Sequence, residues 1–493
     1  MKTQGLIAIL PFLTLAATAI TILLSIAVRR RHRLVFGIAL GGTLLSLLSL
    51  LPAAAFTPRN VTPLFVIDGY ALFYIGLILA TTALVILLSY DYLARRPDRP
   101  EEYYLLLLLA TLGAAALVAS DQFAAFFLGI ETLSISLLGL IAYPRGRVRP
   151  VEAAIKYLML AGVSSAFLLF GMALVYARFG TLSFEQIALD LRASAGAPPD
   201  LYWLTGLAMI VAGVGFKLSL VPFHMWAPDV YEGAPAPVTG FIAVVSKGAV
   251  FALLLRYYLV TGAYAFPSAL MMINVIAIAS ILVGNLLALL QNNVKRILAY
   301  SSIAHLGYLL VAFLAGGALA VEAVTYYLVA YFIMTLGAFG IVTVLSQSGP
   351  EPDVDTLNDY RGLLWHRPWL GGVFTAMLLS LAGIPLTVGF MAKFYALQAG
   401  IHASMWPAVY TLVAGSIIGL FYYLRIIVVM SSPVVMSSPT PEIPVRRPSV
   451  RRTKAEHWTG YTAITILAVA LIWVGVYPSP IIALIRMMAF HVG

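Results

Sequence analysis

The chain has 493 residues, of which 61% are hydrophobic and only 10% charged, whereas soluble domains are about a quarter charged. This composition excludes an ordinary soluble domain and indicates a membrane protein. The net charge of +10 does not indicate nucleic-acid binding, because Lys and Arg lie in short segments between apolar runs and form no basic face. The chain has no cysteine, which excludes a disulfide, a thiol nucleophile and any thiolate-bound iron–sulfur cluster or haem within it.

Apolar segments of about 20 residues, the helix length that crosses about 30 Å of hydrocarbon, follow one another along the chain. The first is expected to be an anchor rather than a signal peptide, because it is about 24 residues long and ends at an arginine cluster. The pattern predicts an all-α membrane protein with fourteen spans. They are 5–28, 34–54, 69–90, 103–119, 121–142, 152–177, 201–226, 237–260, 266–290, 295–315, 321–346, 369–400, 405–430 and 458–478.

The basic residues are shared unequally between the two sides of the membrane. If alternate loops face the same side, 19 of the 30 Lys and Arg residues fall on one side and six on the other. Because positive residues are retained on the cytoplasmic side, the richer side is predicted to be cytoplasmic and both termini to face outward.

Three polar segments lie on that predicted cytoplasmic side. Residues 347–368 and 431–457 are the longest loops and are expected to be docking surfaces or linkers. The second is rich in Ser, Pro and Arg, a composition typical of disorder. Asp229 and Glu232, in "APDVYEGAP", are expected in a loop that faces water or a neighbouring subunit.

Several ionisable residues lie inside the predicted spans. With a rise of about 1.5 Å per residue, Glu131 and Lys247 lie about 15 Å from the nearer membrane surface. Lys217, His305 and Lys393 lie about 14 Å deep by the same reasoning. These five residues are therefore predicted near the midplane.

A charge at the bilayer centre costs about 3 kcal/mol, so such residues need partners or water. For one lysine alone, a structural ion pair is as good an interpretation as a functional role. The structural interpretation has more weight for Lys156, which lies only about 9 Å deep. As a set, the residues favour proton transport, because burial lowers a lysine pKa and raises a carboxylic acid pKa towards neutrality.

Two of the predicted spans contain a proline at membrane depth, Pro222 in the seventh and Pro385 in the twelfth. Broken helices in matching positions indicate an inverted repeat, and an offset of five spans inverts the second unit. The predicted units are spans 4–8 and 9–13, and the alternative is a coincidence between two proline-broken helices. The offset pairs Lys217 with Lys393, Glu131 with His305, and Lys247 with Arg425.

The other histidines are less informative. His224 follows Pro222, and either gates proton uptake or caps a frayed helix end. No two histidines have metal-site spacing, so no metal is expected.

Three stretches of the chain combine its polar residues with the proline breaks. They are "GFKLSLVPFHMWAPDVYEGAPAPVTGFIAVVSK" (215–247), "QNNVKRILAYSSIAHLGYLL" (291–310) and "LAGIPLTVGFMAKFY" (381–395). These stretches closely resemble the antiporter-like N subunits of bacterial respiratory complex I, the NADH-quinone oxidoreductases. The resemblance covers nearly the whole chain, and it implies fourteen spans with inverted repeats and broken spans seven and twelve.

The resemblance also implies residue roles in proton transfer. Glu131 looks like the span-five glutamate that pairs with Lys217 at the input half-channel. Lys247 looks like the connecting lysine and Lys393 like the lysine of the output half-channel. The M-type sister subunits usually carry glutamate at this last position, which favours the N type. The family's span-six lysine and a position on its central axis match Lys156 and His305.

The implied protein is a multi-pass subunit of the bacterial plasma membrane with both termini on the periplasmic side. Its partners would be M-type and small membrane subunits. It would be part of a proton-translocating enzyme but carry no redox chemistry or cofactor, since NADH, FMN, iron–sulfur clusters and quinone would belong to partner subunits.

The chain is expected to divide into five parts. The parts are an N-terminal three-helix segment (1–100), a first repeat (101–262), a second repeat (263–430), a cytoplasmic loop (431–457) and a C-terminal helix (458–493).

Three alternative functions stay open. They are a stand-alone cation/proton antiporter, the equivalent subunit of a hydrogenase- or ferredoxin-linked complex, and a structural scaffold.

Overall fold

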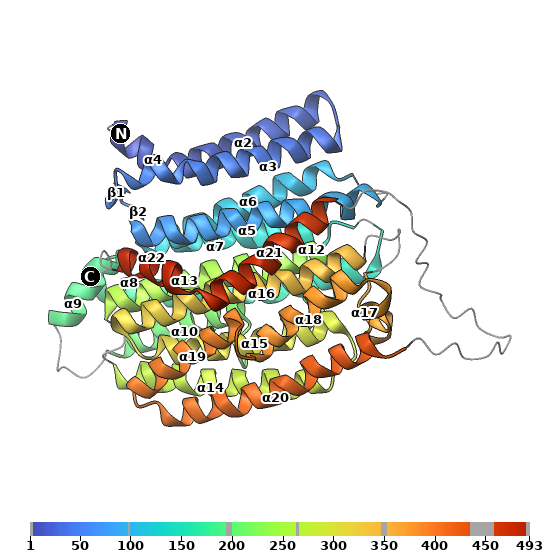
Figure 1. Cartoon of the computed structure of the whole chain (residues 1–493). Helices are drawn as coiled ribbons and strands as arrows, with labels where there is room; N and C mark the ends of the chain where they lie inside the picture. Colours follow the sequence, from blue (N-terminus) through green and yellow to red (C-terminus); the bar gives the residue numbers. More distant parts are fainter. Residues whose placement is uncertain are drawn as a thin grey trace.

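The computed structural model describes residues 3–96, 99–144, 146–193, 200–262, 266–346, 353–433 and 458–489. Its helices run side by side between two end faces (Figure 1). Within the described residues, thirteen helical segments are long and apolar enough to cross a membrane. They are α2 (Leu10–Val28), α3 with α4 (His32–Leu48, Leu50–Ala54), α5 (Gly69–Ala94), α6 (Glu101–Val118), α7 (Phe123–Ile141), α8 (Val148–Phe179), α10 (Leu201–Leu218), α12 to α13 (Ala236–Thr261), α14 (Pro267–Leu289), α15 (Val294–Phe313), α16 (Gly317–Leu345), α20 (Trp406–Ser431) and α21 (Trp458–Val476).

A fourteenth crossing is made of two shorter helices. α18 (Pro368–Ala382) and α19 (Val388–His402) have 15 residues each and follow one another around a break that contains Pro385. A similar break, which contains Pro222, separates α10 from α11 (Trp226–Gly233). The fourteen spans and the two broken helices expected from the sequence are thus confirmed.

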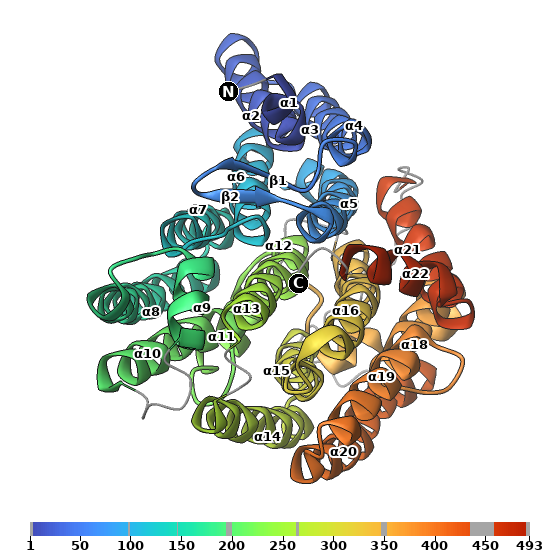
Figure 2. The ribbon, with the colours of Figure 1, turned by 90° about the vertical axis from the view of Figure 1, so that its left-hand side faces the viewer.

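The short elements mark the two end faces. One face, here called the terminal face, carries α1 (Thr3–Ala8), the hairpin of β1 (Arg59–Thr62) and β2 (Phe65–Ile67), α9 (Phe184–Ala193) and α22 (Ser479–Ala489) (Figures 1 and 2). The opposite face, here called the loop face, carries η3 (Leu357–Tyr360) and α17 (Leu363–His366). The first and last helices therefore lie on the same face, as an even number of crossings requires.

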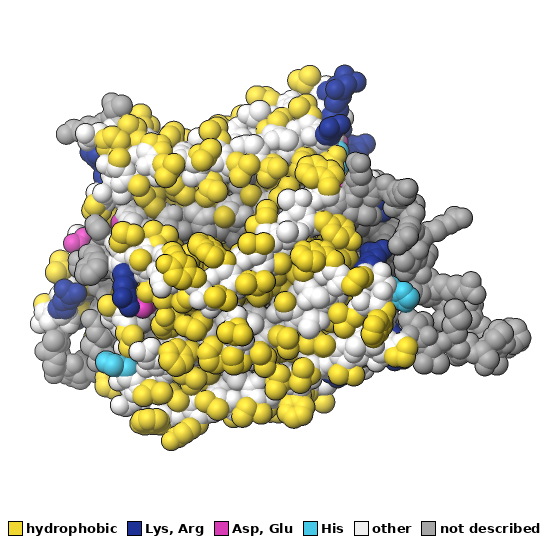
Figure 3. All heavy atoms as spheres, in the orientation of Figure 1, with side chains coloured by type: hydrophobic (Ala, Val, Ile, Leu, Met, Phe, Trp, Pro, Cys, Tyr) yellow, Lys and Arg dark blue, Asp and Glu magenta, His cyan; other side chains and the backbone are white. Residues whose placement is uncertain are grey.

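Burial separates inner from outer helices. In α15, 94% of the most apolar window is buried inside the chain, whereas in α14 only 28% is. Figure 2 shows α13, α15 and α16 in the interior and α2, α8, α14 and α20 at the periphery. On the face shown in Figure 3, hydrophobic side chains cover most of the surface, and Lys and Arg gather towards its two ends. Such a surface suits a hydrocarbon environment.

Two isolated β-bridges relate the halves of the chain. Gln122, which precedes α7, pairs with Ser183 on the terminal face, and Asn293, which precedes α15, pairs with Thr356 on the loop face. Each bridge joins the start of a helix to the segment that follows the next long helix. Matched bridges at opposite faces are what an inverted repeat predicts.

The bridges also suggest a register between the two halves. Glu131 lies nine residues after the first bridge residue, and Ser302 lies nine residues after the second. Counted in this way, His305 matches Ser134. The predicted pairing of Glu131 with His305 differs from this register by one helical turn and stays a prediction.

The predicted pairing of Lys247 with Arg425 stays a prediction, and the two side chains have different surroundings. The guanidinium of Arg425 donates to the carbonyl oxygens of Leu289 (3.0 Å) and Gln291 (2.9 Å). It therefore satisfies carbonyls at the C-terminal end of α14, where a positive charge is favourable. Arg425 is a helix cap and is not part of the buried set.

The two long loops have different outcomes. The side chains of Asp353 (7% exposed) and Asp355, in the part of 347–368 that the structure describes, are largely buried, and the role of this loop as a docking surface or linker stays a prediction. Of the second loop, residues 434–457 lie outside the described residues.

Candidate functional site

Five ionisable side chains lie inside the bundle on five different helices. Lys217 (5% exposed) ends α10, Lys247 (1%) begins α13, His305 (1%) lies on α15 and Lys393 (7%) on α19. Glu131 on α7 is half-buried. The structure thus brings the predicted set into one interior, where charged groups must have polar partners.

Glu131 and Lys217 are bonded to serines rather than to each other. The hydroxyl of Ser165 on α8 donates to Glu131 Oε1 at 2.5 Å, and Lys217 Nζ donates to Ser134 Oγ at 2.6 Å. The two charges remain close enough to interact electrostatically. The structure therefore shows the predicted pair in a separated form.

The helix break holds Lys217 in place. Lys217 is the last residue but one of α10, and Ser219 ends that helix with a left-handed φ of 59°. Val221 N then donates to Ser280 Oγ at 3.0 Å, which fixes the non-helical segment against α14. The unpaired carbonyls and the dipole of a helix C-terminus favour a cation at this position.

Lys393 reaches a similar position from the other side of its break. It lies on the second half-helix, α19, and its Nζ donates to the carbonyl of Ala382, the last residue of α18, at 2.8 Å. Gly383 follows with φ of 87°, and a Cβ there would lie 2.8 Å from Lys393 Cδ. The ammonium groups of Lys217 and Lys393 therefore both lie at the C-terminus of a half-helix. Lys217 belongs to the half-helix before its break, whereas Lys393 belongs to the half-helix after its break.

Lys247 lies next to an irregular turn. It follows the π-helix η1 (Ile242–Ser246), which interrupts span eight and sets the direction of the residues after it. Lys247 Nζ donates to Ser302 Oγ on α15 at 2.7 Å and lies 5.2 Å from the centre of the Tyr231 ring. This contact connects the first repeat to the second.

His305 is surrounded by tyrosines. Its Nδ1 lies 2.7 Å from the hydroxyl of Tyr327 and its Nε2 3.3 Å from that of Tyr423. The ring of Tyr308 packs edge-on against the imidazole and lies 5.2 Å from Lys393 Nζ. His305 and Lys393 are also close enough to interact electrostatically.

Two predicted residues lie apart from this set. Lys156 is 44% exposed and donates to Glu152 and Asp229, both at 2.9 Å, which agrees with the structural interpretation. His224 is buried in the break between α10 and α11, and neither ring nitrogen has a side-chain partner among the described residues.

The acids of "APDVYEGAP" are not in a loop. They lie on α11, and Arg296 NH1 contacts Asp229 at 2.8 Å and Glu232 at 2.9 Å. Burial opposes ionisation of Asp229, but the hydrogen bonds from Lys156 and Arg296 outweigh it and keep its pKa below the usual value. The expectation of a loop was wrong, but both side chains are partly exposed, so the expected contact with water or a neighbouring subunit stays a prediction.

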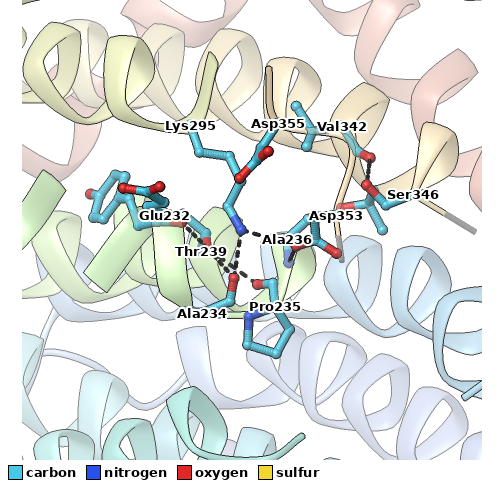
Figure 4. A network of polar contacts seen from close by, with 12 residues as sticks. Glu232, Ala234, Pro235, Ala236, Thr239, Lys295, Val342, Ser346, Asp353 and Asp355 are labelled. Atoms are coloured by element: carbon cyan, nitrogen blue, oxygen red, sulfur yellow. Dashed lines mark hydrogen bonds and ion pairs between the residues drawn. The ribbon is translucent and has the colours of Figure 1, made fainter. Parts of the chain in front are cut away.

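A second polar centre, at the loop face, is built around Asp353. Its carboxylate accepts from Tyr92 OH (2.8 Å), Arg96 (2.9 Å), Lys295 Nζ (2.9 Å) and the backbone N–H of Ala236 (2.9 Å). Figure 4 shows Lys295 pointing between the start of α12 and this loop. Burial raises the pKa of Asp353, but its two cations lower it more, and the net pKa lies below the usual value. This centre, here called the Asp353 hub, ties three parts of the chain together.

A pocket of about 340 Å³ adjoins the Asp353 hub. Its lining includes Arg96, Glu232, Lys295, Asp353 and Asp355. Burial raises the pKa of Asp355 despite the nearby Lys295 ammonium and the Asn293 amide. Among the described residues, no group of three or more His, Asp or Glu side chains could hold a metal ion.

Sequence reasoning missed the hydroxyl groups that hold the charged residues. Ser134 bonds Lys217, and Ser302 bonds Lys247. Tyr331 in turn contacts Ser302. Helical spacing therefore offered a signal for Ser134, three residues after Glu131, and for Ser302, three before His305. No such signal existed for Tyr331, whose contact depends on the tertiary fold.

Comparison with known proteins agrees with this geometry. Residues 120–419 match the family described as NADH:quinone oxidoreductase/Mrp antiporter, TM. NADH-quinone oxidoreductase subunit N of Nitrosospira multiformis is 54% identical over 492 residues, which cover 98% of this chain and 96% of that protein.

Solved structures share the fold. A chain of respiratory complex I from Thermus thermophilus with bound aureothin superposes with a TM-score of 0.78 at 30% identity, over 96% of this chain and 98% of that one. A chain of the Mrp complex from Dietzia sp. gives a TM-score of 0.83 over 100% and 98% at 22% identity, which shows the fold alone. The chain therefore belongs to the NADH:quinone oxidoreductase/Mrp antiporter family and, within it, to the subunit N family of NADH-quinone oxidoreductases.

Proposed function

We propose that this chain is a proton-pumping membrane subunit of NADH-quinone oxidoreductase, and that Glu131, Lys217, Lys247 and Lys393 transfer the protons. The single observation that supports this most is the buried set itself. Four charged or basic groups, Lys217, Lys247, His305 and Lys393, lie at most 7% exposed within a bundle whose outside is apolar. A scaffold has no reason to bear their desolvation cost.

In the proposed mechanism, the separation of Glu131 from Lys217 starts the transfer. A nearby carboxylate stabilises the protonated form of an amine. When Ser165 holds Glu131 and Ser134 holds Lys217, that stabilisation weakens and Lys217 releases its proton towards Lys247. When the two groups pair again, Lys217 takes up a new proton.

Protons leave by way of Lys393. The proton on Lys247 moves through the second repeat to Lys393, whose ammonium lies at the break between α18 and α19. His305 lies between them and takes a supporting role. His224 and Lys156 are assigned supporting roles at the loop face, where the acid-lined pocket offers a place for uptake.

The orientation proposed is that of the positive-inside rule. The loop face is cytoplasmic, and both termini are periplasmic in a bacterial plasma membrane. The five-part division at residues 100, 262, 430 and 457 is part of the same proposal. It is supported by the matched bridges, one in each repeat.

Redox chemistry is assigned to partner subunits. NADH, FMN, iron–sulfur clusters and quinone would bind there, since this chain has no cysteine to ligate a cluster. A conformational or electrostatic signal would reach this subunit along the membrane. Neighbouring antiporter-like M-type and small membrane subunits are the proposed contacts. The exposed Leu128 and Ile135 on either side of the half-buried Glu131 support such a cover over α7.

The test is purification from native membranes followed by reconstitution. Co-purification with peripheral iron–sulfur subunits, and proton uptake driven by NADH and quinone in proteoliposomes, is the expected result. Isolation of the chain alone, with cation-dependent proton exchange, would favour the stand-alone antiporter. Co-purification with a hydrogenase or ferredoxin-binding module would favour that variant of the complex. The 54% identity to a subunit N over nearly the whole chain favours the first outcome.

A further inference from the structure

Two pairs of polar side chains connect α15 and α16. Ser302 Oγ lies 2.7 Å from the hydroxyl of Tyr331, and His305 Nδ1 lies 2.7 Å from the hydroxyl of Tyr327. Ser302 and His305 are three residues apart and so share one face of α15, and Tyr327 and Tyr331 are four apart and so share one face of α16. The result is two parallel rungs between adjacent helices.

The two rungs lie between Lys247 and Lys393. At one end, Lys247 Nζ donates to Ser302 Oγ at 2.7 Å, so this hydroxyl contacts both an ammonium and Tyr331. At the other end, His305 contacts the hydroxyl of Tyr423 on α20 and interacts with Lys393. The rungs therefore extend from one proposed proton carrier towards the next.

Burial makes these hydroxyls costly unless they have a role. Tyr327, Tyr331 and Tyr423 are at most 1% exposed, and a phenylalanine would fill nearly the same volume without a polar group to satisfy. A hydroxyl can accept one proton while it donates its own, which an apolar group cannot do.

A neighbouring buried tyrosine has a different contact. Tyr326, next to Tyr327 on α16, donates to the carbonyl of Val474 at 3.0 Å. A backbone carbonyl does not pass a proton on, so this hydrogen bond joins helices without extending the relay. The rung tyrosines instead contact groups that can both accept and donate.

We propose that Ser302, Tyr331, Tyr327 and Tyr423 form, together with His305, the relay that carries the proton from Lys247 to Lys393. In each step an oxygen or ring nitrogen accepts one proton and releases its own to the next group. One proton moves per passage, and no electron or heavy-atom bond changes. This inference rests on the proposed function and names residues for it.

Two hops in the relay have no direct hydrogen bond among the described contacts. The ring centres of Tyr331 and His305 are 5.8 Å apart, so transfer from the first rung to the second needs a side-chain rotation or a water molecule. The last step needs the same, because Lys393 Nζ donates to the carbonyl of Ala382 and interacts with His305 only electrostatically.

The experiment compares single variants of the whole complex in proteoliposomes. Tyr331→Phe, Tyr327→Phe and Ser302→Ala each remove one relay group, and Tyr326→Phe removes a matched hydroxyl from the same helix. We expect the relay variants to lower this subunit's proton transfer on the order of tenfold or more, as loss of a positioned proton-transfer group does. Tyr326→Phe should pump like the wild type.

A second readout separates a relay from mere packing. Proton transfer that has become limiting gives a larger rate difference between H₂O and D₂O, so this difference should grow in Tyr331→Phe but not in Tyr326→Phe. Ser302→Thr, which keeps a hydroxyl, should restore most of what Ser302→Ala loses. If the tyrosine variants do not assemble, this serine pair decides the question. Equal pumping by Ser302→Thr and Ser302→Ala would overturn the relay.

Lys247→Ala, measured in parallel, distinguishes the two levels of the argument. Loss of pumping in Lys247→Ala with normal pumping in all relay variants would refute the relay and leave the proposed function standing. Normal pumping in every variant, Lys247→Ala included, would refute both.

Discussion

Lys217 is held beside Glu131 without touching it, because its ammonium is bonded to Ser134, one helical turn beyond the glutamate on α7. The carboxylate is likewise bonded away from it, to Ser165. The two charges can therefore pair or separate through small side-chain movements, with a hydrogen-bond partner available in the separated form.

Glu131→Gln and Lys217→Met should each abolish or sharply reduce coupled activity while the complex still assembles. Either change removes one charge of the pair that loads and releases the proton. Proton-to-electron stoichiometry in proteoliposomes measures the effect. Glu322→Gln is the control, because the ion pair that Glu322 makes among the described residues is with the exposed Arg486 on the terminal face. Normal stoichiometry in both site variants would contradict the assignment.

Lys393→Glu should be tolerated better than Lys393→Ala. The position needs a group that binds a proton, and a glutamate supplies one, although it loses the bond to the Ala382 carbonyl. Pumping rates of the two variants give the comparison. An equal loss in both would show that a positive charge is required at this position.

Gly383→Ala should displace Lys393 and destabilise the chain by about 1–3 kcal/mol, since φ there is 87° and the added methyl would approach the lysine side chain. Gly372→Ala, on the same helix with open space around it, should be neutral or stabilising by about 0.5–1 kcal/mol. Thermal unfolding in detergent and proton pumping would be measured for both. Equal pumping by the two variants would show that Gly383 does not position Lys393.

Asp353→Asn should destabilise the chain by about 3–5 kcal/mol, because it leaves Arg96 and Lys295 buried without their shared anion. Glu152→Gln, which removes a 58% exposed partner of Lys156, should cost no more than about 1 kcal/mol. Thermal unfolding of the two variants tests the difference. Similar small losses would show that the Asp353 hub does not stabilise the loop face.

The contribution of Asp353 should also depend on pH. Its folded-state pKa lies below the unfolded value of 3.8, so its ionised form stabilises the fold fully above that value. The contribution is lost as pH falls through the lower, folded-state pKa. The difference in unfolding temperature between wild type and Asp353→Asn should thus be constant above about pH 5 and shrink below pH 4. A difference that grew on acidification would contradict this sign.

The sequence predicted the spans, the broken helices and the buried set because the bilayer fixes span length and makes each charge within a span exceptional. It did not predict the partners of those charges. Serine and tyrosine are common in apolar helices, and the contact between Ser302 and Tyr331 depends on how α15 and α16 pack. The prolines also predicted that Lys217 and Lys393 lie close to helix breaks. They did not predict that Lys217 lies on the half-helix before its break and Lys393 on the half-helix after its break.

The burial of the loop-face acids was not predicted, for a related reason. Composition alone cannot tell a solvated aspartate from a buried one. The cations that pair with Asp353 are Arg96, 257 residues away along the chain, and Lys295, 58 residues away. Register within the repeat was likewise beyond the sequence, because it depends on the pairing of Gln122 with Ser183 and of Asn293 with Thr356.

The two β-bridges anchor α7 and α15 from opposite sides of the membrane. A force on the loop face pulls directly on the helix that carries His305, whereas a force on the terminal face pulls on the helix that carries Glu131. A partner bound at one end face would therefore act on one of these two helices first, and on the other through the packing of the bundle between them.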